Sequence, residues 1–259
     1  MLPAEEAAVR LRGAYRGKPV APLRDLLGPV DSDPAYAVQH INTRFWEGQG
    51  RRIVGRKIGL TAKAVQQQLG VDRPDFGVLF QDMQIADGGI LEPAEVIQPK
   101  AEAEVALIFA RDLDKPDATA QDVFAAVESA VAAIEIVDSR IADWKITFAD
   151  TVADNGSSAF FVLGKERKPL LGLDLYTCGM ALEVNGVIAS LGAGAACLGH
   201  PLNAAAWLAR TLAERGEPLK AGDIVLTGAL GPMVPLTRGA HIKATIGGLG
   251  SVHFNFAAG

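Results

Sequence analysis

Residues 101–109 read Ala101-Glu102-Ala103-Glu104-Val105-Ala106-Leu107-Ile108-Phe109, a strand-like run that carries two acids among apolar residues. Successive side chains of a β-strand point to opposite faces, so Glu102, Glu104, Ala106 and Ile108 lie on one face and the odd-numbered residues on the other. The acidic face becomes apolar after Glu104, and we therefore expect it to be covered. Two carboxylates side by side on a covered face are costly unless a cation lies between them.

A third glutamate, Glu135, interrupts a second apolar run, Ala132-Ala133-Ile134-Glu135-Ile136-Val137. Three carboxylates without histidine or cysteine are the ligands that hard divalent cations such as Mg²⁺ and Mn²⁺ prefer. Glu102 or Glu104 alone is equally well explained as a solvated residue on an edge strand. The Glu-x-Glu pair together with Glu135 favours a metal site formed by all three residues.

The chain changes character near residue 50. Residues 1–50 have helical spacing, whereas residues 51–259 contain short β runs separated by Gly, Pro and Asn-Gly turns. Asn185-Gly186 between two apolar runs is a strong hairpin signal. We expect strands at residues 53–60, 104–110, 132–138, 159–164, 179–184, 224–227, 242–246 and 251–256. We expect three helices in this part of the chain. One covers residues 62–69 after the capping residue Thr61, one begins at the capping-box sequence of residues 119–122, and one runs from Pro201 and ends before Gly216.

Two helices are predicted in the N-terminal segment. The first covers residues 3–15, with Ala8, Leu11 and Tyr15 at helical spacing. The second is expected to begin with Asp33 as N-cap and Pro34 at the first helical position, and to end at Gly48. Its apolar stripe consists of Ala37, Val38, Ile41 and Phe45.

Strands and helices do not alternate regularly along the chain, which argues against a doubly wound sheet or a (β/α)₈ barrel. The predicted class is α+β. We expect a helical N-terminal segment of residues 1–50, followed by a β-rich catalytic domain of residues 51–259.

The composition excludes several classes of protein. Of 259 residues, 49% are hydrophobic and 21% are charged, and 25 Lys and Arg against 30 Asp and Glu leave a net charge of −5, which argues against nucleic-acid binding. Two cysteines cannot form a disulfide framework, so the reducing cytoplasm is the expected location. The acidic start of the chain does not resemble a signal peptide, and no run is long and apolar enough to span a membrane.

Lys57 and Asp75 are the candidate acid–base residues. Lys57 lies in a predicted strand and is expected to share a face with Gly55 and Gly59, which would leave room for a ligand. A lysine there can stabilise the negative charge of a carboxylate or enolate, although an exposed lysine on an edge strand is the simpler interpretation of the pattern alone. Asp75 follows Arg73-Pro74 and is expected in a turn, where aspartates are usually structural.

Three hydroxyl residues are candidate substrate contacts. Ser157 and Ser158 precede a predicted strand and either line a polar pocket or belong to a turn. Thr227 begins the Gly- and Pro-rich segment of residues 227–233, which either presents backbone N–H groups to a carboxylate or is a simple turn. The sequence has no G-x-S-x-G, H-E-x-x-H, Walker or complete G-x-G-x-x-G motif, so we expect neither a serine hydrolase nor a nicotinamide or nucleotide cofactor.

A family resemblance extends over nearly the whole chain. The segments that carry it are residues 55–61, 68–71, 74–77, 102–104, 135–141, 153–155, 198–204 and 226–233. They resemble the 2-keto-4-pentenoate hydratases of the fumarylacetoacetate hydrolase superfamily. The resemblance implies a mixed β-roll, a Mg²⁺ or Mn²⁺ ion, and assembly into a homo-oligomer. It also implies that Glu102, Glu104 and Glu135 are metal ligands and that Lys57 and Asp75 are pocket residues.

The implied reaction is the hydration of 2-hydroxypenta-2,4-dienoate to 4-hydroxy-2-oxopentanoate in the meta-cleavage of aromatic compounds. Related 4-oxalocrotonate decarboxylases resemble one another in an Arg-containing segment, and residues 227–233 contain no Arg, which favours a monocarboxylate substrate. The alternatives are a decarboxylase, a C–C bond hydrolase, or a weakly active partner subunit of a hydratase–decarboxylase complex. A homologous decarboxylase or the downstream aldolase is the expected protein partner.

Overall fold

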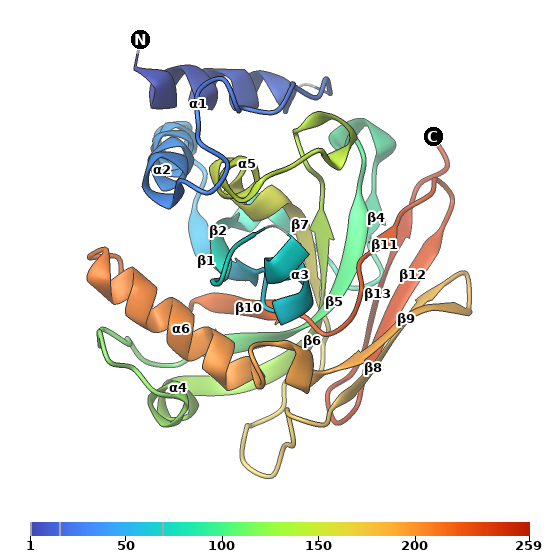
Figure 1. Cartoon of the computed structure of the whole chain (residues 1–259). Helices are drawn as coiled ribbons and strands as arrows, with labels where there is room; N and C mark the ends of the chain where they lie inside the picture. Colours follow the sequence, from blue (N-terminus) through green and yellow to red (C-terminus); the bar gives the residue numbers. More distant parts are fainter. Residues whose placement is uncertain (1, 16, 69) are drawn as a thin grey trace.

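The protein has an α+β fold of two mixed β-sheets, with the helices gathered around the larger sheet (Figure 1). The computed structural model describes residues 2–15, 17–68 and 70–259. No helix in the described part of the chain is long and apolar enough to cross a membrane.

The larger sheet has the strand order β2-β1-β10-β5-β6-β7-β3, and β11 pairs with β5 beside this path. Most neighbours are antiparallel, but β1 pairs in parallel with β10 and β3 with β7. Its strands are β1 (Ile53–Gly59), β2 (Asp75–Phe80), β3 (Gln84–Ile85), β5 (Lys100–Phe109), β6 (Val127–Val137), β7 (Ser158–Leu163), β10 (Ile224–Ala229) and β11 (Val234–Pro235).

The second sheet has the order β4-β13-β12-β8-β9 and lies on the right in Figure 1. Its β8–β9 hairpin confirms the Asn-Gly signal, because Asn185 and Gly186 both have positive φ, of 52° and 78°. Its strands are β4 (Ile90–Leu91), β8 (Gly179–Val184), β9 (Val187–Ala193), β12 (His241–Ile246) and β13 (Gly250–Phe256).

The helices cover the first sheet from several sides. In Figure 1, α1 lies at the top with α2 below it and beside α5, α6 crosses the lower left of the molecule, and α3 lies centrally. The α-helices are α1 (Pro3–Ala14), α2 (Ser32–Gly48), α3 (Lys63–Gln68), α4 (Ala120–Ala126), α5 (Phe148–Ala153) and α6 (Pro201–Glu214). Short 3₁₀ helices occupy Gln81–Met83, Pro93–Glu95, Ala142–Trp144, Asn155–Ser157 and Gly194–Ala196. The helix predicted at residues 62–69 corresponds to α3, and its expected last residue, Leu69, lies outside the described residues.

The two faces of β5 are both covered, as the alternation predicted. The odd-numbered residues 101–109 belong to the main hydrophobic cluster, and Ala106 and Ile108 belong to a second cluster on the other face. Helices α1 and α2 contribute Leu11 and Val38 to the main cluster, so the N-terminal segment shares its core with the β-sheets.

Three predictions about local structure were wrong. Asp75 is not in a turn but begins β2, a strand that is buried along its whole length and therefore lacks the alternating pattern. Helix α2 has Asp31, not Asp33, as its N-cap; Pro34 is tolerated in the first turn because the first N–H groups of a helix have no intrahelical acceptor. In its expected apolar stripe, Ala37 and Phe45 are exposed, and Gln39 and Asn42 are buried instead.

Helix α5 was not predicted from the sequence. It begins with a capping box in which the Thr147 hydroxyl accepts from the N–H of Asp150 and the Asp150 carboxylate accepts from the N–H of Thr147. The same Thr-x-x-Asp pattern correctly predicted α4 after Thr119, so this signal was available at residues 147–150 as well.

Candidate metal and acid–base site

The three glutamates singled out in the sequence lie together in the first sheet. Glu102 on β5 is paired directly with Glu135 on β6, and Glu104 follows two residues later on the same face of β5. One carboxylate oxygen of each lies within 4.8 Å of the others. Glu104 and Glu135 have no exposed surface, whereas Glu102 is partly exposed. These central strands are not edge strands, so the interpretation of the glutamates as solvated edge residues was wrong.

The donor atoms of this cluster fit a hard divalent cation. Among the described residues, Glu104 Oε1 and both carboxylate oxygens of Glu135 lack a hydrogen-bond partner, although they are buried. The other oxygen of Glu104 accepts from the backbone N–H of Gly228 at 2.7 Å, which orients this carboxylate. Buried anionic oxygens without partners are costly unless a cation compensates them, and oxygen ligands are those that Mg²⁺, Mn²⁺ and Ca²⁺ prefer.

Burial and the charges of neighbouring acids raise the proton affinity of Glu102 and Glu104. Burial raises the pKa of Glu102 to about 7, against the opposing effect of Lys57. Burial, followed by the charges of Glu135 and Glu102, raises the pKa of Glu104 well above its usual value. Without a cation, the site therefore holds protons at pH values where exposed glutamates are ionised.

Lys57 provides the positive charge beside the cluster. Its Nζ lies 3.0 Å from Glu135 Oε2 and donates to the Gly156 carbonyl at 3.0 Å, and the residue is 2% exposed. Strand β1 is flanked by β2 and β10, so the interpretation of Lys57 as an exposed edge residue was wrong. Burial alone would lower the pKa of Lys57, but Glu135 and the other nearby acids raise it above its usual value, which keeps the ammonium charged.

The glycines beside Lys57 do not have the role expected for them. A Cβ at Gly55 would lie 1.9 Å from the Ile224 carbonyl oxygen, and one at Gly59 would lie 2.1 Å from Asp75 Oδ1. These two glycines therefore admit neighbouring protein atoms, not a ligand. Space for the Lys57 side chain comes from Gly77 and Gly156, where a Cβ would lie 3.1 and 3.0 Å from Lys57 Cδ.

Asp75 lies on β2 at the register position opposite Gly59 and is 1% exposed. Within the described residues, its Oδ1 has no hydrogen-bond partner. Burial raises its pKa, the Lys57 charge opposes this shift, and Glu135 adds to it. A buried carboxyl group with a raised pKa beside an ammonium group is suited to proton transfer.

The hydroxyl residues occupy different positions around this centre. Ser157 and Ser158 end the turn that presents the Gly156 carbonyl to Lys57; Ser157 contacts the Thr151 hydroxyl at 3.4 Å, and the Ser158 hydroxyl has no partner among the described residues. The Thr227 hydroxyl donates to the Val105 carbonyl at 3.0 Å. In the segment after Thr227, the N–H groups of Gly228 and Leu230 donate to Glu104 and Ala103, so these two groups have acceptors within the protein.

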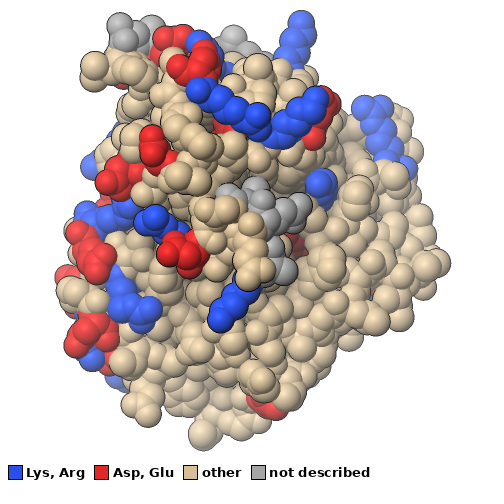
Figure 2. All heavy atoms as spheres, in the orientation of Figure 1, with Lys and Arg blue, Asp and Glu red and all other residues tan. Residues whose placement is uncertain are grey.

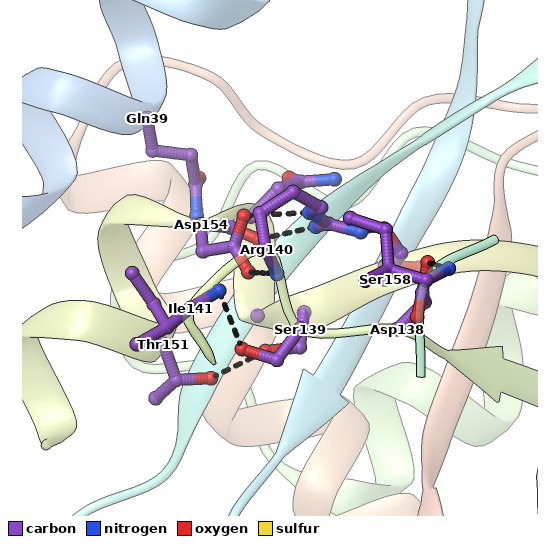
Figure 3. Close-up of polar contacts among 12 residues, drawn as sticks. Gln39, Asp138, Ser139, Arg140, Ile141, Thr151, Asp154 and Ser158 are labelled. Carbon is purple, nitrogen blue, oxygen red and sulfur yellow. Dashed lines mark hydrogen bonds and ion pairs between the residues drawn. The ribbon is translucent and has the colours of Figure 1, made fainter. Parts of the chain in front are cut away.

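Sequence reasoning did not single out Arg140, Asp154 or Asn155 individually. Arg140 and Asp154 form a buried ion pair of 2.7 Å behind the turn that contacts Lys57 (Figure 3). The Asn155 side chain accepts from the N–H of Val78 and donates to its carbonyl, which joins this turn to β2. No sequence pattern indicates that residues 140 and 154 form a pair. A single arginine directly after an apolar strand run could have been singled out as a buried charge that needs a partner.

The molecular surface is hollowed near the centre of the face drawn in Figure 2. In Figure 2, a recess beside the grey atoms has red carboxylate atoms deep inside it, while the surrounding rim is mostly uncharged. Charged groups inside a recess of the surface are typical of small-molecule sites.

Comparison with known proteins identifies the family. The family model described as fumarylacetoacetate (FAA) hydrolase C-terminal matches residues 51–257. The chain is 55% identical over 257 residues to 2-keto-4-pentenoate hydratase 2 of Dechloromonas aromatica (strain RCB), covering 99% of this chain and 98% of the relative. The chain belongs to the fumarylacetoacetate hydrolase superfamily. Within this superfamily it is also 53% identical over 253 residues to 2-keto-4-pentenoate hydratase of Paraburkholderia xenovorans (strain LB400), covering 97% of this chain and 94% of that one.

A solved structure in the same superfamily has the same fold. The 4-oxalocrotonate decarboxylase from Pseudomonas putida G7, complexed with magnesium and adipate, matches with a TM-score of 0.94 and 37% identity, covering 98% of this chain and 97% of that chain. This similarity confirms the predicted α+β fold, including its helical N-terminal part.

Proposed function

We propose that this chain is a divalent-metal-dependent hydratase that converts 2-hydroxypenta-2,4-dienoate and water into 4-hydroxy-2-oxopentanoate, in the meta-cleavage of aromatic compounds. The observation that carries the proposal is a cluster of three glutamates, two of them fully buried, next to Lys57 and Asp75, in a chain 55% identical to a 2-keto-4-pentenoate hydratase.

Glu102, Glu104 and Glu135 would hold the cation, with Mg²⁺ or Mn²⁺ as the proposed ion. A divalent cation there supplies Lewis-acid polarisation of the C2 oxygen and carboxylate of a 2-oxo acid. Lys57 remains protonated at neutral pH and offers its ammonium group to the negative charge that develops on the substrate.

Hydration requires three changes on the substrate carbon chain. C5 gains a proton as the C2 hydroxyl loses its own, which gives a conjugated ketone with an electrophilic C4. Water then adds its oxygen at C4, and C3 gains a proton. Asp75 and Lys57 are the proposed groups for these proton transfers, and Ser157, Ser158 and Thr227 are the proposed hydroxyl neighbours of the substrate.

The decisive experiment is a spectrophotometric assay with 2-hydroxypenta-2,4-dienoate and, separately, 4-oxalocrotonate, each with and without EDTA. We expect hydration of the first compound, loss of activity in EDTA, and recovery with Mg²⁺ or Mn²⁺. Decarboxylation of 4-oxalocrotonate as the main activity would establish the alternative reaction. Inactivity with both compounds would indicate a partner subunit, and full activity in exhaustive chelation would exclude the metal site.

Residues 227–233 favour a substrate with a single carboxylate. This segment contains no Arg, and an unpaired buried carboxylate costs several kcal/mol, whereas one methylene changes binding by about 1–3 kcal/mol. We expect kcat/KM for the dienoate, and for its methyl-extended hexadienoate, to exceed kcat/KM for a diacid. The ratio between monoacid and diacid should be larger than the ratio between the two monoacids. Equal values for monoacid and diacid would instead implicate Lys100, on the same face of β5 as Glu102.

Only some residues of this segment are placed where a substrate could reach them. Leu230 is buried in the main hydrophobic cluster, so it cannot contact a substrate tail. A Cβ at Gly231 would lie 2.6 Å from the Leu191 carbonyl oxygen, which makes exposed Pro232 the better position for an introduced Arg. We expect P232R to narrow the gap between monoacid and diacid.

We also propose that the chain forms a homo-oligomer in the cytoplasm and associates with a homologous decarboxylase or with the aldolase that consumes its product. Light scattering of the purified protein tests the first proposal. Co-purification with each separately expressed partner tests the second, and a monomer without bound partner would contradict both.

A further inference from the structure

The turn between Asp154 and Ser158 accepts a hydrogen bond from Lys57 through its backbone. The Gly156 carbonyl accepts from Lys57 Nζ at 3.0 Å, which is the same distance as that from Nζ to Glu135 Oε2. These two contacts, one with a backbone carbonyl and one with a carboxylate, define the direction of the Lys57 ammonium group. The position of Lys57 therefore depends on the position of this turn.

The backbone of the turn has an unfavourable conformation. Asn155, Gly156 and Ser157 have φ values of 58°, 60° and 55°, so three consecutive residues adopt left-handed conformations, and two of them carry a Cβ. Such residues persist only when surrounding contacts hold them in place. The contacts that hold this turn are thus part of what positions Lys57.

The Arg140 side chain makes three of those contacts (Figure 3). Its Nη2 donates to the Asp154 carbonyl at 2.7 Å, its Nη1 donates to the Ser158 carbonyl at 3.1 Å, and its Nε donates to Asp154 Oδ1 at 2.7 Å. One planar guanidinium group thereby joins the first and last residues of the turn. Arg140 is 2% exposed, and the ring of Tyr15 at the end of α1 covers it, with its centroid 4.6 Å from Arg140 Cζ.

Asn155 attaches the turn to a neighbouring strand, in addition to the N–H of Asp138, which donates to the Ser157 carbonyl at 2.8 Å, and the Thr151 hydroxyl, which contacts the Ser157 hydroxyl. Its side-chain amide forms two hydrogen bonds with the backbone of Val78, of 2.7 and 2.9 Å, so the turn is joined to β2 next to Gly77. A Cβ at Gly77 would lie 2.3 Å from the Asn155 carbonyl oxygen, which shows how closely the turn and the strand approach.

We propose that Arg140 and Asn155 are positioning residues that act on the reaction through Lys57: they hold the left-handed turn at residues 155–157 so that the Gly156 carbonyl directs the Lys57 ammonium toward Glu135. This inference deepens the proposed function and rests on it only for its kinetic test. Neither residue needs to contact the substrate or the cation.

The kinetic test is a double-mutant cycle between Arg140→Lys and Lys57→Met. Lysine retains the positive charge but cannot join Asp154 and Ser158 as the planar guanidinium does. We expect Arg140→Lys alone to lower kcat by roughly 10- to 100-fold with KM changed less than about threefold, and to change the residual kcat of the Lys57→Met protein less than about twofold. An equal loss in both backgrounds would overturn the proposal, because the effect would then not pass through Lys57.

Two further variants keep the test decisive. Asn155→Gly removes the attachment to Val78 while relieving the left-handed strain, so it replaces Arg140→Lys in the cycle if that variant does not fold. Arg56→Lys is the matched control, because Arg56 neighbours Lys57 on β1 and makes none of the contacts of the turn. We expect its kcat to be unchanged, and unchanged kcat in both Arg140→Lys and Asn155→Gly would overturn the proposal.

A crystal structure of Arg140→Lys provides a readout that needs no turnover. We expect the Gly156 carbonyl to move away from Lys57 Nζ, so that the 3.0 Å contact is lost. An unmoved turn with this contact intact would overturn the proposal. A lack of hydratase activity in the unmodified protein would overturn the proposed function and leave this structural test valid.

Discussion

At the scale of single residues, the site depends on charge that is buried and only partly compensated. Lys57 is the cation of the cluster, and its partner Glu135 has no exposed surface. Their ion pair lacks well-directed hydrogen bonds at the Glu135 oxygens, which leaves these oxygens available to a second cation. The same buried charges that we propose for the reaction therefore make the metal-free protein less stable.

Replacing Lys57 with Met is expected to reduce both activity and stability. Loss of the ammonium should lower kcat by a factor of roughly 10²–10⁴, because it removes charge stabilisation and proton transfer together. Breaking a buried pair costs about 3–5 kcal/mol, so the free energy of unfolding without metal should also fall. Steady-state kinetics and urea denaturation measure the two effects, and unchanged kinetics would exclude Lys57 from the reaction.

Replacing Glu104 with Gln is expected to weaken cation binding while preserving the fold. The amide oxygen can still accept from the Gly228 N–H, but one ligand charge is lost. We expect the Kd for Mg²⁺, measured by calorimetry, to rise roughly tenfold or more, and the metal-free variant to be at least as stable as the parent. Glu128→Gln, an exposed glutamate on the strand that carries Glu135, is the matched control. An unchanged Kd in the Glu104 variant would contradict the metal site.

At the scale of elements, α2 supports the strand that carries Asp75. The Gln39 side chain, 4% exposed, donates to the carbonyl oxygens of Phe76 on β2 and Val152 on α5, both at 2.9 Å. Phe76 follows Asp75 directly, so this single amide joins the N-terminal segment to the site. The periodic pattern of α2 did not reveal this contact, because a buried glutamine looks like a solvated one in the sequence.

Gln39→Leu is expected to destabilise the protein although its volume is similar. The substitution leaves two buried carbonyl groups without these bonds, at a cost of about 1–3 kcal/mol in the free energy of unfolding. His40→Leu provides a control with the same new residue at a neighbouring exposed position. The urea midpoint should fall for the first variant and stay constant for the second. Equal midpoints would show that the Gln39 bonds contribute nothing measurable.

At the scale of the whole molecule, the acidic cluster links stability to pH and to metal. Glu102 has a pKa of about 7 in the folded protein, and the pKa of Glu104 is also raised. In the unfolded chain both return to about 4.3. The folded state therefore binds more protons than the unfolded state between these values, and raising the pH through this range favours unfolding. Asp154, with a pKa of about 6, acts in the same direction.

The metal-free protein is thus expected to lose stability between pH 5 and pH 8. The urea midpoint in EDTA should fall as pH rises through about 7, and saturating Mg²⁺ should raise the midpoint more at pH 8 than at pH 5, because protons no longer compete with it. The Glu104→Gln protein should show a shallower pH dependence, which separates the cluster from Asp154. A metal-free protein that gains stability over this range would contradict the assigned proton affinities.

Local sequence was sufficient to predict much of this protein. The alternation at residues 101–109 predicted that both faces of β5 are covered. Asn185-Gly186 predicted a hairpin, and Thr119 predicted the start of a helix. These features depend on neighbours a few residues apart, whose geometry is the same in any fold. The three glutamates were recognisable for a related reason, since acids within apolar strand runs are costly wherever those strands lie.

Only the tertiary structure decided what these residues do to one another. It paired Glu102 with Glu135 and brought Lys57 to 3.0 Å from the latter, and it placed Asp75 in a strand that its sequence did not reveal. It also joined Arg140 to a turn that lies 14 residues further along the chain. Strand order and the packing of distant segments set these contacts. Local propensity carries no information about which segments meet, so the chemistry of the site became visible only once the chain was folded.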